Sequence, residues 1–120
     1  MSDLVRVAVD AMGGDYAPVE PVKGAIEAVN ADERVKVQLV GQVDVIEKEL
    51  QKYTYPKERV EIVPATEIIE TGEPPVNAIR HKKDSSIVVG MKKVRYGEAD
   101  AFVSSGSTGA VLVGGQTIVG

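Results

Sequence analysis

Hydrophobic residues fall into short β-branched runs that alternate with longer segments in which apolar residues recur at helical spacing. A short apolar run predicts a buried strand, and apolar residues three and four positions apart predict one buried face of a helix. The predicted strands are residues 4–9, 35–40, 60–63 and 101–103. The predicted helices run from the first-turn prolines Pro18 and Pro21 to residues 30–32, over 44–53, over 75–80, from cap residues 84–86 to Gly97, and over 110–119.

This alternation predicts an α/β fold, with a parallel sheet between two layers of helices. The third strand is short and is expected near an edge of the sheet. Aromatic residues make up only 4% of the chain, so the core must consist of Val, Ile, Leu and Ala. We expect residues 1–120 to form a single α/β domain, because no linker-like stretch divides them.

Composition narrows the class of protein. The net charge of −4 excludes nucleic-acid binding by bulk electrostatics, and we expect no such partner. The chain has no Cys, which excludes disulfides and thiolate metal sites and fits a reducing cytosol. It has no signal-peptide pattern and no apolar run of the roughly 20 residues that span a bilayer. No charged residue follows Asp100, so we expect the sequence to continue in a longer protein.

The glycine loop that follows the fourth strand is the first candidate site. Its candidate phosphate ligands are Ser104, Gly106, Ser107, Thr108 and Gly109. Glycines let backbone amides approach an anion, and a helix that starts there adds partial positive charge. The alternative is structural: Ser107 or Thr108 caps the helix and Gly106 turns the chain. The Lys of a Walker loop is absent.

A second glycine loop follows the first strand, with candidate ligands Asp10, Gly13, Gly14 and Asp15. Ligands of parallel sheets bind beyond the carboxyl ends of the strands, so both loops line one crevice if their strands are neighbours. The alternative for the two Asp residues is turn formation and capping. They lack the further ligands that Mg²⁺ needs, and no Gly-x-Gly-x-x-Gly fingerprint is present, so we expect neither metal nor cofactor.

A basic segment, residues 80–83, forms the third candidate site, with Arg80, Lys82 and Lys83 as phosphate ligands. These cations precede a predicted helix start, where the helix dipole disfavours them, and a bound anion would offset both charges. Lys82, Lys83 and His81, the one histidine, are the catalytic candidates, and His81 suits a general base. The alternative is a solvent-exposed, non-catalytic surface.

These segments carry a resemblance to a known family. Residues 8–15 read Ala-Val-Asp-Ala-Met-Gly-Gly-Asp, which resembles the N-terminal signature of the PlsX-type phosphate acyltransferases. The likeness continues through Pro75, Ala78, Arg80, Lys82-Lys83, Ser85-Ser86 and residues 97–110. Where the family usually reads Ser-Ala-Gly-Asn-Thr-Gly-Ala, this chain has Ser105 and Ser107 in place of Ala and Asn. Family members are nearly three times longer, so the chain resembles their N-terminal part.

The resemblance implies a fold like that of isocitrate and isopropylmalate dehydrogenases, with the site in a cleft between two lobes. It implies an enzyme that moves a fatty acyl group from acyl carrier protein to inorganic phosphate, giving acyl phosphate for phospholipid synthesis. It also implies a homodimer in the cytoplasm with peripheral membrane association. Two alternatives stay open: a non-catalytic anion-binding α/β fragment, and a phosphotransacetylase-like enzyme that uses coenzyme A.

Overall fold

The structure, a computed structural model, describes residues 4–70, 72–106, 110 and 114–119 of the 120-residue chain. Its strands are β1 (Val5–Asp10), β2 (Val35–Gly41), β3 (Val60–Pro64) and β4 (Ala101–Val103). Its helices are α1 (Val19–Ala31), α2 (Val43–Leu50), α3 (Pro75–His81) and α4 (Ser86–Arg95), with a 3-10 turn η1 (Lys57–Arg59) and a π-helical segment η2 (Gly115–Val119).

The four strands form one parallel sheet in the order β3-β2-β1-β4. Val9 of β1 is in register with Leu39 of β2 and with Val103 of β4. The predicted parallel sheet is therefore confirmed, as is the place of β3 at an edge. β1 and β4 are direct neighbours, so the loops that follow them leave the sheet side by side.

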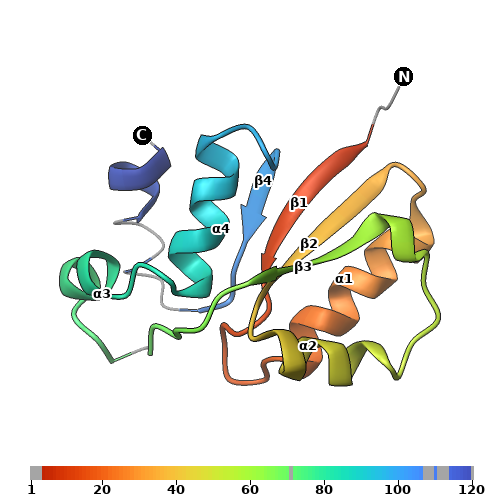
Figure 1. Ribbon diagram of the computed structural model, residues 1–120, viewed down its shortest axis with the longest axis horizontal. Helices are drawn as coiled ribbons and strands as arrows, with labels where there is room; N and C mark the ends of the chain where they lie inside the picture. The colour runs from red at the N-terminus through yellow and green to blue at the C-terminus, as the bar shows by residue number, and fades with distance from the viewer. Residues whose placement is uncertain (1–3, 71, 107–109, 111–113, 120) are drawn as a thin grey trace.

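Helices cover both faces of the sheet (Figure 1), which confirms the three-layer α/β prediction. On one face, the predicted apolar stripe of α1, which includes Val22 and Val29, packs against Val37 and Leu39 of β2. On the other face, Ala8 and Val40 pack in a cluster with Val94 and other side chains of α4. The period of two along a strand sends neighbouring residues to opposite faces, which lets one sheet build two cores.

The helix ends agree with the sequence in most places. Gly97 follows α4 with a φ of 74°, a left-handed conformation that suits the predicted glycine at a helix end. α2 ends earlier than predicted, at Leu50 rather than Tyr53. The reason is a tightening of the chain before Pro56: the amides of Lys52 and Tyr53 donate to carbonyls only three residues back.

The predicted last helix is corrected over residues 115–119, which are π-helical. Adjacent Gly114 and Gly115 weaken the preference for α-helix at this point. None of the described helices is both long enough and apolar enough to cross a lipid bilayer.

Candidate functional site

The two glycine loops meet at the carboxyl edge of the sheet, between β1 and β4. A Cβ added to Gly13 would overlap the Asp10 carboxyl and lie 2.9 Å from the Gly106 amide nitrogen. A Cβ at Gly14, where φ is 91°, would lie 3.1 Å from both the Cβ and the carbonyl oxygen of Ser105. The backbones approach this closely because the glycines carry no side chain. We call residues 10–14, residues 104–106 and Ser86 the loop junction.

Asp10 is the centre of the loop junction. Its residue is only 1% exposed, and its carboxyl oxygens accept hydrogen bonds from three donors. The Ser86 hydroxyl donates at 2.5 Å, the Ser104 hydroxyl at 2.7 Å and the Met12 amide at 3.0 Å. The Gly106 amide in turn donates to the Ser104 oxygen at 3.0 Å. This chain of bonds ties β1, α4 and the loop after β4 into one unit, so Asp10 orders the backbone around it.

Ser86 is the site residue that sequence reasoning missed, because it was predicted only as a helix cap. Ser85 is the cap, since its hydroxyl accepts from the Val88 amide at 3.2 Å, and Ser86 is left to donate to Asp10. The Ser86 amide donates to the Glu67 carbonyl at 3.2 Å, which fixes the start of α4 beside the sheet. The adjacent pair of serines was the available signal, because one helix start needs a single cap.

The loop junction also presents backbone donors. Within the described part of the chain, no protein acceptor is recorded for the amides of Gly13, Gly14 or Ser105. Gly13 is a buried residue, and buried backbone amides without a partner are rare in folded proteins. Successive backbone amides in a loop can form a concave site for an anion.

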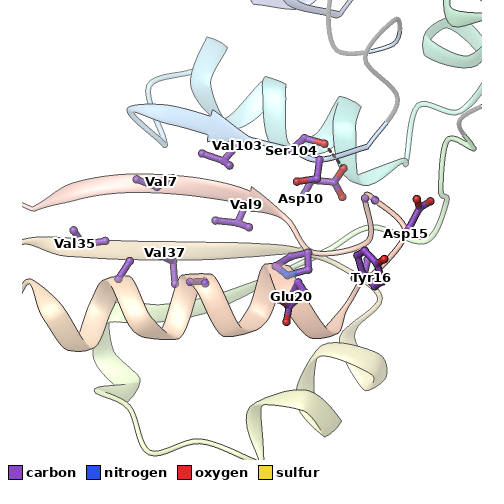
Figure 2. A pocket seen from close by; sticks show the side chains of 18 residues that line it. Val7, Val9, Asp10, Asp15, Tyr16, Glu20, Val35, Val37, Val103 and Ser104 are labelled. Atoms are coloured by element: carbon purple, nitrogen blue, oxygen red, sulfur yellow. Dashed lines mark hydrogen bonds between the residues drawn. The ribbon is translucent and has the colours of Figure 1, made fainter.

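A trough of about 350 Å³ opens from the loop junction and runs between the sheet and α1 (Figure 2). Its polar end is lined by the loop junction together with Asp15, Tyr16 and Glu20. The remainder is apolar, with Val7, Val9, Val37 and Val103 on the sheet side and Gly24 and Ala28 on α1. A largely apolar pocket with a few convergent polar groups is the usual form of a small-molecule site.

The basic segment joins the end of α3 to the start of α4. Arg80 and His81 lie in the last turn of α3, where the helix dipole favours cations, rather than against a dipole. The inference that a bound anion must offset an unfavourable helix dipole therefore does not hold for Arg80. Both side chains are exposed, as is Lys83.

Lys82 has protein partners. Its ammonium group lies 2.6 Å from Glu73 Oε2 and donates to the Ile68 carbonyl at 2.7 Å. The hydrogen bond from Lys82 to Glu73, together with the charge of Lys82, holds the pKa of the Glu73 carboxyl below its usual value. Lys82 thus ties the segment that carries Ile68 and Glu73 to the end of α3, which is a structural role.

Of the sequence-predicted ligands, the structure brings together Asp10, Gly13, Gly14, Ser104 and Gly106, with Asp15 at the rim of the same trough. Ser107, Thr108 and Gly109 lie outside the described residues. Among the residues that are described, no cluster of three or more His, Asp or Glu side chains is arranged to hold a metal ion.

The fold and the loop junction define an α/β protein with a candidate anion-binding site at the carboxyl edge of a parallel sheet. The chain belongs to the family described as "Fatty acid synthesis protein", which it matches over residues 5–120. It is similar to proteins named phosphate acyltransferase from Alkaliphilus oremlandii (49% identical over 117 residues) and Halothermothrix orenii (46% over 116 residues). Each alignment covers 97% of this chain but only 34% and 35% of the respective relative. The chain therefore spans about a third of the length of the curated relatives it matches.

Proposed function

We propose that this chain forms the phosphate-binding part of a phosphate acyltransferase, an enzyme that moves a fatty acyl group from acyl carrier protein to inorganic phosphate. The observation that carries the proposal is that the amide of Gly13, a buried residue where two glycine loops meet, has no protein acceptor among the described residues. The name phosphate acyltransferase, borne by both relatives, supports phosphate and an acyl group as the two reaction partners.

In the proposed reaction, backbone amides of the loop junction hold phosphate, and Asp10 keeps those amides in place through Ser104 and Ser86. A phosphate oxygen attacks the thioester carbonyl carbon and forms a C–O bond. The resulting oxyanion collapses, the C–S bond breaks, and the carrier leaves as a thiolate that takes a proton from solvent. No general base is required, because phosphate at neutral pH already carries negatively charged oxygens.

The basic segment is proposed to supply positive charge, whereas the loop junction holds the phosphate. Arg80 and Lys83 are exposed, so they can attract phosphate and an acidic carrier protein over a longer range. Lys82 contributes less free charge, because Glu73 lies against it. His81, also exposed, was predicted as a candidate general base, a role that the proposed reaction does not require.

The rest of the proposal concerns the complete protein. We infer that it adopts the two-lobed dehydrogenase-like architecture, with this chain as the N-terminal part. We also infer a cytoplasmic homodimer that associates peripherally with membrane and uses no cofactor or metal. Gel filtration with light scattering tests the dimer, because a monomeric mass at assay concentration would contradict it.

An acyl-transfer assay tests the reaction. The complete protein is mixed with phosphate and either acyl carrier protein or coenzyme A as the acyl donor, and acyl phosphate is trapped with hydroxylamine as the hydroxamate. The 120-residue chain is assayed in parallel. We expect phosphate-dependent product with the carrier protein. A preference for coenzyme A would favour the phosphotransacetylase-like alternative, and no product from either donor would favour an anion-binding module.

A further inference from the structure

We infer that the apolar part of the trough holds the hydrocarbon tail of the acyl group, with the reacting carbonyl at the loop junction. This inference rests on the proposed function and adds the acyl-chain site to it. The polar and apolar parts of the trough are continuous, and they are arranged in the order of an acyl group's own head and tail (Figure 2).

The topology explains why the trough is open. α1 packs its buried stripe over β2, through Val22, Ile26 and Val29. The crossover from β3 to β4 carries α3 and α4, and α4 packs on the opposite face, as right-handed connections require. Within the described chain, no crossover helix therefore passes over the β1–β4 half of the α1 face. Val103 of β4 is consequently 54% exposed, although it is a strand residue.

Small residues on α1 keep the trough wide. Gly24 lines it, and a Cβ added there would meet no atom within 4 Å. Ala28 follows one helical turn later on the same side of α1. Larger side chains at these positions would project into the space above Val7 and Val9. Small residues on a helix can also serve packing, but here they line the same trough as the loop junction, whose Gly13 amide has no protein acceptor among the described residues.

An extended hydrocarbon tail fits this lining better than a polar occupant does. Beyond the polar end, which includes Asp15, Tyr16 and Glu20, the walls are the side chains of Val, Ala and Pro together with Gly24, which offer dispersion contacts and no side-chain hydrogen bonds. Each methylene that moves from water into such a site improves affinity about fourfold. Affinity is therefore expected to rise with chain length until the trough is full.

The test narrows the trough by Gly24→Leu, and separately by Ala28→Leu, in the complete protein. The first readout is the ratio of kcat/KM for long-chain to short-chain acyl carrier protein. We expect this ratio to fall about tenfold or more, because added methylenes in an apolar pocket discriminate at that level. The KM for phosphate should not change. Lys23→Leu places the same side chain on an exposed position of α1 that does not line the trough and serves as the matched control.

A second readout needs no turnover. Alkyl phosphonates of increasing chain length, which cannot transfer an acyl group, are titrated calorimetrically into wild type and Gly24→Leu. We expect wild-type affinity to increase with each methylene and Gly24→Leu to lose that increase.

If wild-type affinity for the phosphonates does not change with chain length, the inference is overturned even when acyl transfer is observed. It is equally overturned if both leucine variants fold and keep the wild-type ratio of kcat/KM for long-chain to short-chain acyl carrier protein. That result is expected if another part of the complete chain fills the trough. If instead no acyl phosphate forms but the phosphonate series rises, the proposed reaction fails and the tail site stands.

Discussion

The loop junction and the basic segment are both made of residues expected to contact phosphate, but they are built in opposite ways. The centre of the loop junction is buried at Asp10, Gly13 and Ser86, and Asp10 holds the junction together through hydrogen bonds from the loop after β1, from α4 and from the loop after β4. The basic segment is mostly exposed, and Lys82 within it is paired with Glu73. The difference separates two functions: a fixed geometry that orients a ligand, and a surface charge that attracts it. Substitutions in the two regions should therefore fail in different ways.

The largest expected effect is that of Asp10→Ala. The substitution leaves the buried Ser86 hydroxyl and the Ser104 hydroxyl without their acceptor. Each buried polar group left unpaired costs about 1–3 kcal/mol, so the free energy of unfolding should fall by roughly 2–6 kcal/mol. Urea denaturation measures the loss. Asp15→Ala, at an exposed position of the same loop, should change stability by no more than about 0.5 kcal/mol. Equal effects of the two variants would contradict the central place of Asp10.

Gly14→Ala should have the next largest effect. Gly14 has a φ of 91°, and the added Cβ would lie 3.1 Å from the Ser105 carbonyl oxygen. Left-handed backbone costs a residue with a side chain roughly 1–2 kcal/mol. We expect a stability loss of that size together with weaker phosphate binding, because Ser105 is displaced. Gly72→Ala is the matched control, since its added Cβ would meet no atom within 4 Å. Wild-type phosphate binding by Gly14→Ala would show that the loop junction tolerates displacement.

Substitutions in the basic segment should have smaller effects. Lys83→Ala should weaken phosphate binding by about threefold, the size expected of an exposed charge, and the loss should shrink in high salt. Lys82→Ala should weaken it less, because Glu73 already neutralises that ammonium group. In a double-mutant cycle, the Lys82–Glu73 pair should contribute only slightly to stability, since both side chains are partly exposed. A sharp loss of phosphate binding in Lys82→Ala would instead place Lys82 at the phosphate.

The smallest changes in stability are expected when the pH is lowered. Hydrogen bonds from Lys82, from the Thr66 hydroxyl and from Arg6 hold the pKa values of Glu73, Asp84 and Asp100 below their usual values. A carboxyl whose pKa is lower in the folded state stabilises the fold above its unfolded pKa, which is about 4. That stabilisation is lost as the pH falls through the folded pKa. We expect denaturation midpoints to decline below about pH 4, and Asp84→Asn to flatten that decline. If the denaturation midpoint of Asp84→Asn depends on pH as that of wild type does, the Asp84 carboxyl does not contribute to the decline.

Much of the fold was predictable because its signals are local. The β-branched runs identify the four strands, and the spacing of Val22, Ile26 and Val29 identifies the buried face of α1. The early end of α2 and the π-helical turn at residues 115–119 were missed. Both depend on hydrogen bonds that differ from the regular helical pattern by one residue, and hydrophobic spacing does not report such a difference.

The site was predictable only in part. The glycine loops were found from Gly13, Gly14 and Gly106, and their meeting depended on whether β1 and β4 are neighbours, which the pattern of a single chain leaves open. The link from Ser86 to Asp10 spans 76 positions in sequence, so no local motif indicates it. The dipole-based prediction for Arg80 failed because it considered only the helix that follows the basic segment, whereas Arg80 also lies at the favourable end of α3. The isocitrate dehydrogenase-like architecture stays a prediction.

The central claim is that backbone amides at the loop junction bind phosphate. Calorimetric titration of phosphate into the complete protein and its Gly13→Ala variant tests it most directly, with urea denaturation used to establish that the variant is folded. The added Cβ would overlap the Asp10 carboxyl and crowd the Gly106 amide, so we predict saturable binding to wild type and a loss of about tenfold or more in the variant. A folded Gly13→Ala protein that binds phosphate as tightly as wild type would contradict the account.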